Sequence, residues 1–170
     1  MADAARVGVL FVCHANICRS PLAHALFVHR ADARGILDRF DIDSAGTWAA
    51  DGILPHINSI AVGKHHGIDL AVAGTSRIIA PDDLQRFHHV IAMDRDNEMD
   101  IMRLQRLSAF GIVDGPQARI RLLRRVAQPH AQGKDADVPD PIGRGPEAFQ
   151  RTYEIINAGV EALLDELDRR

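Results

Sequence analysis

The chain has 170 residues, of which 46% are hydrophobic and 25% charged, the balance of an ordinary soluble globular protein. This length suits one domain with a buried core, and we expect residues 1–170 to form a single domain. The formal net charge of −3 excludes a general attraction to nucleic acid, and no apolar run is long enough to span a membrane.

In chain order, hydrophobic spacing predicts alternating strands and helices. The predicted elements are a strand at 7–12, a helix at 20–34, a strand at 40–45, a helix at 58–66, a strand at 89–93, a helix at 97–110, a strand at 118–123, a loop at 128–145 and a helix at 146–167. This alternation favours an α/β fold of three layers, in which helices cover both faces of a central four-stranded parallel sheet, as in Rossmann-like folds.

The two cysteines, Cys13 and Cys18, lie five positions apart in one short segment and do not form a disulfide framework. Free thiols suit a reducing compartment, and the residues from Met1 to Arg6 lack the features of a secretory signal. We therefore expect a cytoplasmic protein. Arginines cluster at 119–125, where Ile120 and Leu122 alternate with them, and we interpret this segment as a strand with a solvated face.

Cys13 directly follows the first predicted strand, and Arg19 stands six residues later, where the first helix begins. Ligands of open α/β sheets bind outside the carboxyl ends of strands, which is where this segment lies. Backbone N–H groups of a short loop and a helix N-terminus can surround one anion, and arginine adds a planar fork for two oxygens. The same positive surroundings favour the thiolate of Cys13, which can attack phosphorus and leave a phosphoenzyme for water to hydrolyse.

Arginine is common in this chain, so the spacing of Cys13 and Arg19 is weak evidence by itself. A buried core cysteine before an ordinary helix would give the same spacing. The context is more specific, because a buried strand precedes the loop, an asparagine lies within it, and Ser20 and Pro21 stand at the helix start.

The segment from Cys13 to Pro21 resembles the signature of the low-molecular-weight protein tyrosine phosphatases, Val-Cys-x-Gly-Asn-x-Cys-Arg-Ser-Pro, and differs from it at Ala15, where glycine is usual. The resemblance implies the phosphotyrosine phosphatase I-like fold and a hydrolase acting on phosphotyrosine and aryl phosphates. It implies Cys13 as nucleophile and Arg19 as phosphate ligand. The other residues expected to bind substrate or phosphate are His14, Ala15, Asn16, Ile17, Cys18, Ser20 and Trp48.

The late loop supplies a candidate proton donor, Asp140, between Pro139 and Pro141. Flanking prolines stiffen the backbone around this carboxyl group. Asp-Pro is a common turn by itself, but here it resembles the general-acid motif of the same family, which also precedes the final helix. We expect Asp140 to protonate the leaving group and then to act as a base toward water.

The resemblance extends to residues that support the loop. Ser44-Ala45-Gly46-Thr47 resembles a family segment whose serine bonds the loop asparagine, here Asn16, and holds it in a left-handed conformation. Ser20 is expected to donate to the Cys13 thiolate. Arg77 and the segment from Met93 to Asn97 match further family landmarks, and we expect Asp94 to support the loop.

Besides Ala15, four residues depart from the family pattern, at three places in the chain. Ile142 and Gly143 stand where many members carry a tyrosine pair that forms one wall of the substrate cleft. Trp48 follows the Ser-Ala-Gly-Thr segment immediately, whereas the other aromatic wall usually comes several residues later. Gly74 lies where some members have a histidine that supports the asparagine. These departures concern substrate preference more than reaction type.

No metal or other cofactor is expected. The nine histidines do not form a His-x3-His pair with a partner carboxylate, and the acidic residues from Asp94 to Asp100 lack a calcium-loop pattern. The expected partner is a phosphotyrosine protein, with a bacterial-type tyrosine kinase as a candidate, and we expect a monomer or weak dimer.

Two other functions are compatible with part of the pattern. A thiol-dependent arsenate reductase can share this fold and loop, but that chemistry passes oxidation to later cysteines, and none follows Cys18. A non-catalytic phosphotyrosine-binding or redox-sensing module would not need Asp140.

Overall fold

The computed structural model describes residues 6–109 and 117–169. Four parallel strands form one sheet in the order β2-β1-β3-β4. The strands are β1 (Val7–Cys13), β2 (Phe40–Gly46), β3 (His89–Ala92) and β4 (Arg119–Leu122). The α/β fold class and the four-stranded parallel sheet predicted from the sequence are confirmed.

Strand β1 lies in the middle of the sheet, and its neighbours are reached in opposite directions. The chain leaves β1 through α1 (Arg19–Ala33) to pair with it as β2, and later returns on its other side as β3. This reversal of direction is a topological switch point, where a crevice opens beyond the carboxyl ends of the strands. Cys13 is the last residue of β1 and is paired with Gly46, so the sheet itself places the thiol at the crevice.

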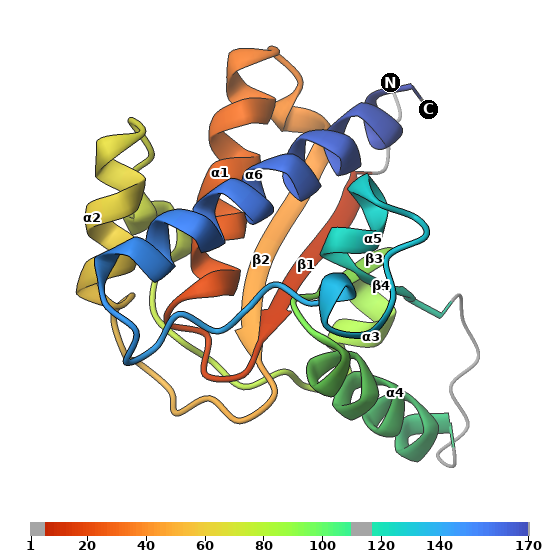
Figure 1. Cartoon of the computed structure of the whole chain (residues 1–170). Helices are drawn as coiled ribbons and strands as arrows, with labels where there is room; N and C mark the ends of the chain where they lie inside the picture. The colour runs from red at the N-terminus through yellow and green to blue at the C-terminus, as the bar shows by residue number, and fades with distance from the viewer. Residues whose placement is uncertain (1–5, 110–116, 170) are drawn as a thin grey trace.

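Alternate residues of β1 pack into two separate cores. Val9, Phe11 and Cys13 belong to a core with α1 and α6 (Pro146–Asp168), whereas Leu10 and Val12 belong to a core with Ile101 of α4 (Arg95–Ala109). Figure 1 shows α1 and α6 crossing the front of the sheet, with α4 lying apart from them toward the lower right. Burial on both faces explains why β1 is apolar at successive positions rather than at alternate ones.

The other helices are α2 (Ile57–His65), α3 (Asp83–Arg86) and α5 (Leu123–Ala127), with single 3-10 turns at η1 (Leu37–Arg39), η2 (Leu70–Ala73) and η3 (Gly133–Ala136). The short helices α3 and α5 and these turns were not predicted, because they hold too few residues for a helical period. The strand predicted at 118–123 ends at Leu122, since Leu123 turns into the α1 and α6 core as the first residue of α5.

The predicted boundaries of the long helices differ from the observed ones by one or two residues. Helix α4 begins at Arg95 rather than at residue 97, and its predicted last residue, Phe110, lies outside the described residues. The apolar face predicted for the final helix is confirmed. Its buried members include Phe149, Tyr153, Ile156, Val160, Leu163, Leu164 and Leu167.

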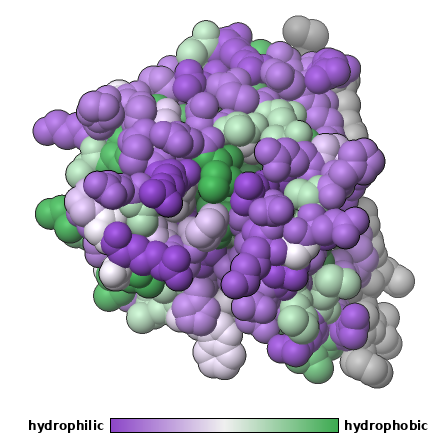
Figure 2. Space-filling view, in the orientation of Figure 1, coloured by the Kyte–Doolittle hydropathy of each residue, from purple (hydrophilic) through white to green (hydrophobic). Residues whose placement is uncertain are grey.

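The arginine-rich segment forms β4, which lies at the edge of the sheet. Arg119 is exposed, and the guanidinium of Arg121 bonds both carboxylate oxygens of Glu166, at 3.0 and 2.8 Å. The face seen in Figure 2 is mainly hydrophilic, with apolar side chains at its left edge, near its centre and at its lower right. Within 6–109 and 117–169, no helix combines the length and the apolar composition that crossing a bilayer requires.

Candidate active site

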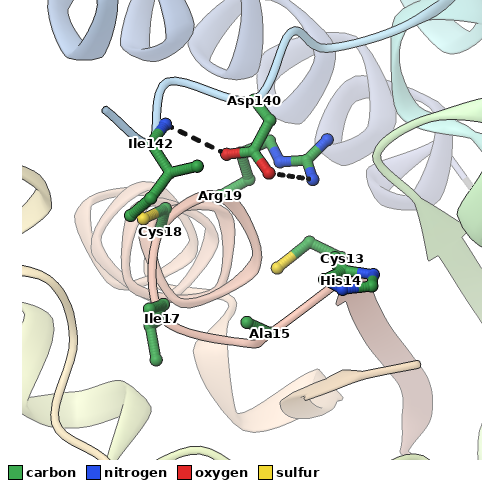
Figure 3. Close-up of a pocket in the computed structure, with 8 residues that line it drawn as sticks. All are labelled: Cys13, His14, Ala15, Ile17, Cys18, Arg19, Asp140 and Ile142. Atoms are coloured by element: carbon green, nitrogen blue, oxygen red, sulfur yellow. Dashed lines mark hydrogen bonds and ion pairs between the residues drawn. The ribbon is translucent and has the colours of Figure 1, made fainter. Parts of the chain in front are cut away.

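Cys13 borders a cavity of about 250 Å³ at the carboxyl end of β1. The loop 14–18 leads from the strand into α1, whose first residue is Arg19. Asp140 and Ile142 close the cavity from the loop before α6 (Figure 3). The lining residues are Cys13, His14, Ala15, Ile17, Cys18, Arg19, Asp140 and Ile142. Parts of the chain more than 100 positions apart therefore meet around one thiol.

Neighbouring segments hold the carbonyl groups of the loop. Cys13 O accepts from Thr47 N at 2.9 Å and His14 O from Trp48 N at 2.9 Å, while Ile17 O accepts from His56 N at 2.7 Å. None of the backbone N–H groups of residues 14–18 donates to another described residue. The carbonyls are thus tied to the surrounding protein, and the N–H groups are available to an anion.

Gly46 allows this close packing of the loop on β2. A Cβ atom at this position would collide with the carbonyl oxygen of His14 and would lie 2.9 Å from the backbone nitrogen of Asn16. Both contacts are with backbone atoms, which cannot rotate away as a flexible side chain could. The Ser-Ala-Gly-Thr pattern therefore has a steric requirement for glycine at its third position.

Asn16 is the only described non-glycine residue with a positive φ, at 56°. This left-handed conformation is unfavourable for an L-residue, so the surroundings must hold it. The side-chain amide of Asn16 donates to Ser20 Oγ at 2.8 Å and Ser44 Oγ at 3.0 Å, and its Oδ1 accepts from the backbone nitrogen of Arg77 at 3.0 Å. The structure thus shows the Ser44 contact that the resemblance implies, with a backbone N–H of Arg77 on the opposite side.

Ser20 connects this network to the thiol. Its Oγ lies 3.0 Å from Cys13 Sγ and also lies 3.3 Å from the carbonyl oxygen of Ala45. Because Oγ accepts from Asn16, its own hydrogen remains for Cys13 or Ala45. A hydroxyl donor at this distance can stabilise a thiolate.

Arg19 is 2% exposed and anchored by three groups. One terminal nitrogen donates to Asp94 Oδ2 at 2.6 Å and Val138 O at 3.0 Å, and the other donates to Asp140 Oδ2 at 3.2 Å. Burial opposes its charge, but attraction to Cys13, Asp140 and Asp94 outweighs burial and raises the pKa of Arg19. Its Nε is buried without a partner among the described residues, which leaves a donor for a ligand.

Asp94 supports the site through Arg19 rather than through the loop itself. Its Oδ1 also accepts from Asn97 N at 2.8 Å, in the first turn of α4. The carboxylate is therefore held by its own helix and in turn fixes the direction of the Arg19 guanidinium.

Asp140 extends into the cavity directly after two residues that are held by hydrogen bonds to other parts of the chain. Val138 N donates to the carbonyl oxygen of Met93, the residue after β3, at 2.8 Å, and Thr152 Oγ1 of α6 donates to Pro139 O at 3.3 Å. The side chain of Asp140 is 42% exposed, and its Oδ1 accepts from Ile142 N at 3.2 Å. Figure 3 shows both of its contacts, with Arg19 and with Ile142, at the mouth of the cavity.

Cys18 lines the same cavity but has a different environment from that of a reactive thiol. It is 5% exposed, and burial, followed by the negative charges of Asp140 and Cys13, raises the pKa of its thiol to about 12. Its carbonyl accepts from Ser59 Oγ of α2 at 3.3 Å. Its side chain is therefore neutral at physiological pH and acts as an apolar part of the wall.

The remaining predicted residues fall in two places. His14 is exposed at the rim, while Ala15 and Ile17 line the wall. Trp48, however, does not line this cavity. It is 70% exposed, its indole N–H donates to Asp100 Oδ2 of α4 at 3.2 Å, and it borders a separate groove with Leu107. The expectation that Trp48 contributes to the substrate cleft does not fit this position, because its short distance from Gly46 in the chain directs it toward α4.

Three contributors were not identified from the sequence: the carbonyl of Val138, the hydroxyl of Thr152 and the backbone of His56. They act through main-chain atoms or on main-chain atoms, so residue type and spacing carry no signal for them. Among the described residues, no group of three or more histidine, cysteine or acidic side chains is arranged to hold a metal ion.

Comparisons with known proteins agree with this arrangement. A family model described as low molecular weight phosphotyrosine protein phosphatase matches residues 8–170. A low molecular weight protein-tyrosine-phosphatase of Streptomyces coelicolor is 33% identical over 159 residues, which cover 92% of this chain and 90% of that protein.

Solved structures match over nearly the whole chain. The crystal structure of YfkJ from Bacillus subtilis has a TM-score of 0.81 at 30% identity and covers 97% of this chain and 96% of that one. The structure of DARP, a Drosophila arginine phosphatase, has a TM-score of 0.79 at 28% identity, with coverages of 94% and 96%.

Proposed function

Because the chain belongs to the low molecular weight phosphotyrosine protein phosphatase family, we propose that it hydrolyses phosphotyrosine monoesters in two steps through a phosphocysteine at Cys13. The observation that carries this proposal is the meeting of Cys13, Arg19 and Asp140 around one cavity with unused N–H donors. We propose the whole chain, residues 1–170, as one phosphatase domain.

In the first step, Cys13 Sγ forms a bond to phosphorus while the bond from phosphorus to the tyrosine oxygen breaks. The N–H groups of residues 14–18 and Arg19 bind the three non-bridging oxygens, whose charge they stabilise through the transition state. The Nε of Arg19, which has no partner among the described residues, supports this role. A guanidinium fixed by Asp94 loses little freedom when it binds.

Asp140 protonates the departing tyrosine oxygen. In the structure its Oδ2 bonds Arg19 at 3.2 Å, and we propose that the substrate phosphate takes over Arg19. This exchange frees the carboxyl group at the mouth of the cavity, where the leaving oxygen lies. Its 42% exposure supports the role, because the group can gain and lose protons with solvent.

In the second step, Asp140 takes a proton from water. The water oxygen bonds to phosphorus, the bond between sulfur and phosphorus breaks, and Cys13 leaves as a thiolate with inorganic phosphate as the other product. Ser20, 3.0 Å from the sulfur, supports the thiolate as the leaving group of this step.

The lining of the cavity supports a phosphorylated aromatic ring rather than phosphoarginine, despite the fold shared with an arginine phosphatase. Ala15, Ile17 and Ile142 form apolar walls. A guanidinium leaving group would require partners of opposite charge, and Asp140, the one carboxylate among the described residues that line the cavity, is neutral when it holds the proton that the first step requires. Phosphotyrosine is therefore expected to be hydrolysed faster than phosphoarginine.

The decisive experiment measures turnover of p-nitrophenyl phosphate and of phosphotyrosine peptides in the presence of EDTA. We expect activity in the wild type and none in Cys13→Ser. With a 32P-labelled substrate, the label should be trapped on the sulfur of Cys13 in the wild type during turnover. EDTA-sensitive turnover, or full activity of Cys13→Ser, would overturn the proposed mechanism.

Two other functions make different predictions. A thiol-dependent arsenate reductase would consume reductant when arsenate is added, and it requires a later cysteine, whereas none follows Cys18. A binding or redox-sensing module would retain affinity for phosphotyrosine without turnover. Phosphate release in the assay above excludes such a module as the sole function.

We also propose reversible inactivation by peroxide, since Cys13 and Cys18 line one cavity. Oxidation of Cys13 to the sulfenic acid allows condensation with Cys18 and loss of water. The raised pKa of Cys18 slows this second step. Dithiothreitol should restore activity, and mass mapping that finds only sulfinic or sulfonic acid on Cys13 would contradict the proposal.

This chemistry requires reduced thiols, which supports a cytoplasmic location. For the partner, we propose a phosphotyrosine protein such as a bacterial-type tyrosine kinase. We also propose that this chain is a monomer or weak dimer. Trapping with Cys13→Ser, followed by mass spectrometry, identifies such partners, and light scattering gives the oligomeric state.

A further inference from the structure

A second groove, of about 320 Å³, adjoins the cavity of Cys13 on the far side of Asp140. Asp140 lines both the cavity and this groove, which we call the flanking groove. Its other lining residues include Arg144, Glu147, Arg151, Thr152 and Ile155, from the loop before α6 and the first turns of that helix. Figure 1 shows this blue segment passing across the front of the molecule beside the first turn of α1.

The two arginines of the flanking groove differ from several other exposed arginines of this protein. Arg34, Arg39 and Arg86, for example, form ion pairs with acidic side chains at 2.7 to 3.0 Å. The guanidinium groups of Arg144 and Arg151 bond no described residue. The carboxylate of Asp140 is bonded to Arg19, so Glu147 is the one acidic side chain in the groove without a described partner.

We propose that the flanking groove is a subsite for an acidic side chain of the substrate, a few residues from the phosphotyrosine. This inference rests on the proposed function. A peptide with its phosphotyrosine in the cavity must pass over the rim, and an extended chain advances about 3.3–3.6 Å per residue. Since the two spaces share the wall of Asp140, the second or third residue from the phosphotyrosine reaches the groove.

The size of the effect follows from the exposure of the arginines. An ion pair at the surface strengthens binding about 1.4- to 5-fold, and salt weakens it. One carboxylate that pairs with both Arg144 and Arg151 should therefore raise kcat/KM by about 2- to 25-fold over a neutral residue of the same shape. The carboxylate of Glu147 repels an acidic side chain in the groove, so its replacement by a neutral residue should increase the preference for the acidic peptide.

The test compares phosphotyrosine peptides that differ by Asp or Asn at one position, scanned over three residues on either side. The readout is the ratio of kcat/KM for the two peptides of each pair. We expect the ratio to exceed one at a particular position and to decline with added salt. Arg144→Gln and Arg151→Gln should each lower this ratio, and Glu147→Gln should raise it.

Arg106→Gln is the matched control, because Arg106 is an exposed arginine of α4, on the other core of the protein, without a described partner. It removes the same charge and should leave the ratio unchanged. If the wild type fails to hydrolyse p-nitrophenyl phosphate, the proposed function is wrong. If it hydrolyses this ester but shows no Asp preference, or if the preference persists in the Arg144→Gln, Arg151→Gln double variant, the subsite is wrong.

Discussion

Cys13 and Cys18 border the same cavity and are similarly buried, at 2% and 5% exposed, yet we predict that alkylation distinguishes them sharply. Burial, with smaller contributions from Asp140 and Cys13, raises the pKa of Cys18 from 9.0 to about 12. The thiolate is the reactive form, and at neutral pH its fraction falls about tenfold for each unit of pKa. The difference of three units therefore makes native Cys18 about 1000-fold less reactive than the same thiol in the unfolded chain.

The assay uses Cys13→Ser, in which Cys18 is the remaining thiol, and follows iodoacetamide incorporation by mass spectrometry. The variant loses the charge at position 13 but retains burial and Asp140, the two larger causes of the shift. Rates are compared in buffer and in guanidinium chloride. Between about pH 9 and pH 12 the rate should be level for the unfolded chain but still rise for the native protein, since the raised pKa delays ionisation.

The matched variant Cys18→Ser reports on Cys13 alone. Its native labelling should be fast and should abolish phosphatase activity in proportion. A native rate for Cys18 within about tenfold of the unfolded rate would show that this thiol is exposed or ionised, and the assignment of Cys18 as an inert part of the wall would then be wrong.

The other predictions concern residues around the thiol. Asp140→Asn should slow turnover of poor leaving groups by about 10²- to 10⁴-fold and good ones much less; a wild-type rate on a poor leaving group would contradict its role as acid. The Arg77 side chain forms ion pairs with Asp43 and Asp83, which hold in place the backbone N–H that donates to Asn16. Arg77→Gln should therefore lower both kcat and Tm, with partial rescue by Arg77→Lys. An unchanged kcat alongside a lowered Tm would restrict Arg77 to a structural role. Ile142→Tyr should lower KM for phosphotyrosine peptides about 2- to 12-fold at a similar kcat, because a stacked aromatic pair adds about 0.5–1.5 kcal/mol; an unchanged KM would mean that this side chain does not border the ring. Gly143 is left unchanged in that test because its φ of +71° strains any L-residue.

The position of Trp48 along the chain already departed from the family pattern for an aromatic wall, since it directly follows the Ser-Ala-Gly-Thr segment. Trp48 is held against Asp100 rather than over the cavity, and Ile142 takes the wall opposite the loop. The cavity therefore has aliphatic rather than aromatic walls. This makes Ile142→Tyr the informative substitution for substrate preference, and it separates ring binding from the chemical step.

Local sequence determined the part of the site that one continuous segment builds. The apolar run of β1, the loop from His14 to Cys18 and the start of α1 follow each other directly, so strand, loop and helix preferences suffice to predict a thiol at an anion site. The long amphipathic helix α6 was predicted for the same reason, since its period extends over 23 residues. The roles of Asp140 and Ser44 came from their resemblance to a family pattern, because neither residue type indicates a partner by itself.

Only the tertiary structure decided which distant groups meet the loop. Arg19 bonds Asp140 across 121 positions and the Val138 carbonyl across 119, and Asn16 bonds the backbone of Arg77 across 61. Such contacts depend on how helices pack on both faces of the sheet and on which loops end at the same edge. Local propensity has no access to that geometry, since each contact requires two segments that are distant in the chain to be placed by the packing of the core. The direction of Trp48, the environment that keeps Cys18 neutral and the flanking groove all arise at this level.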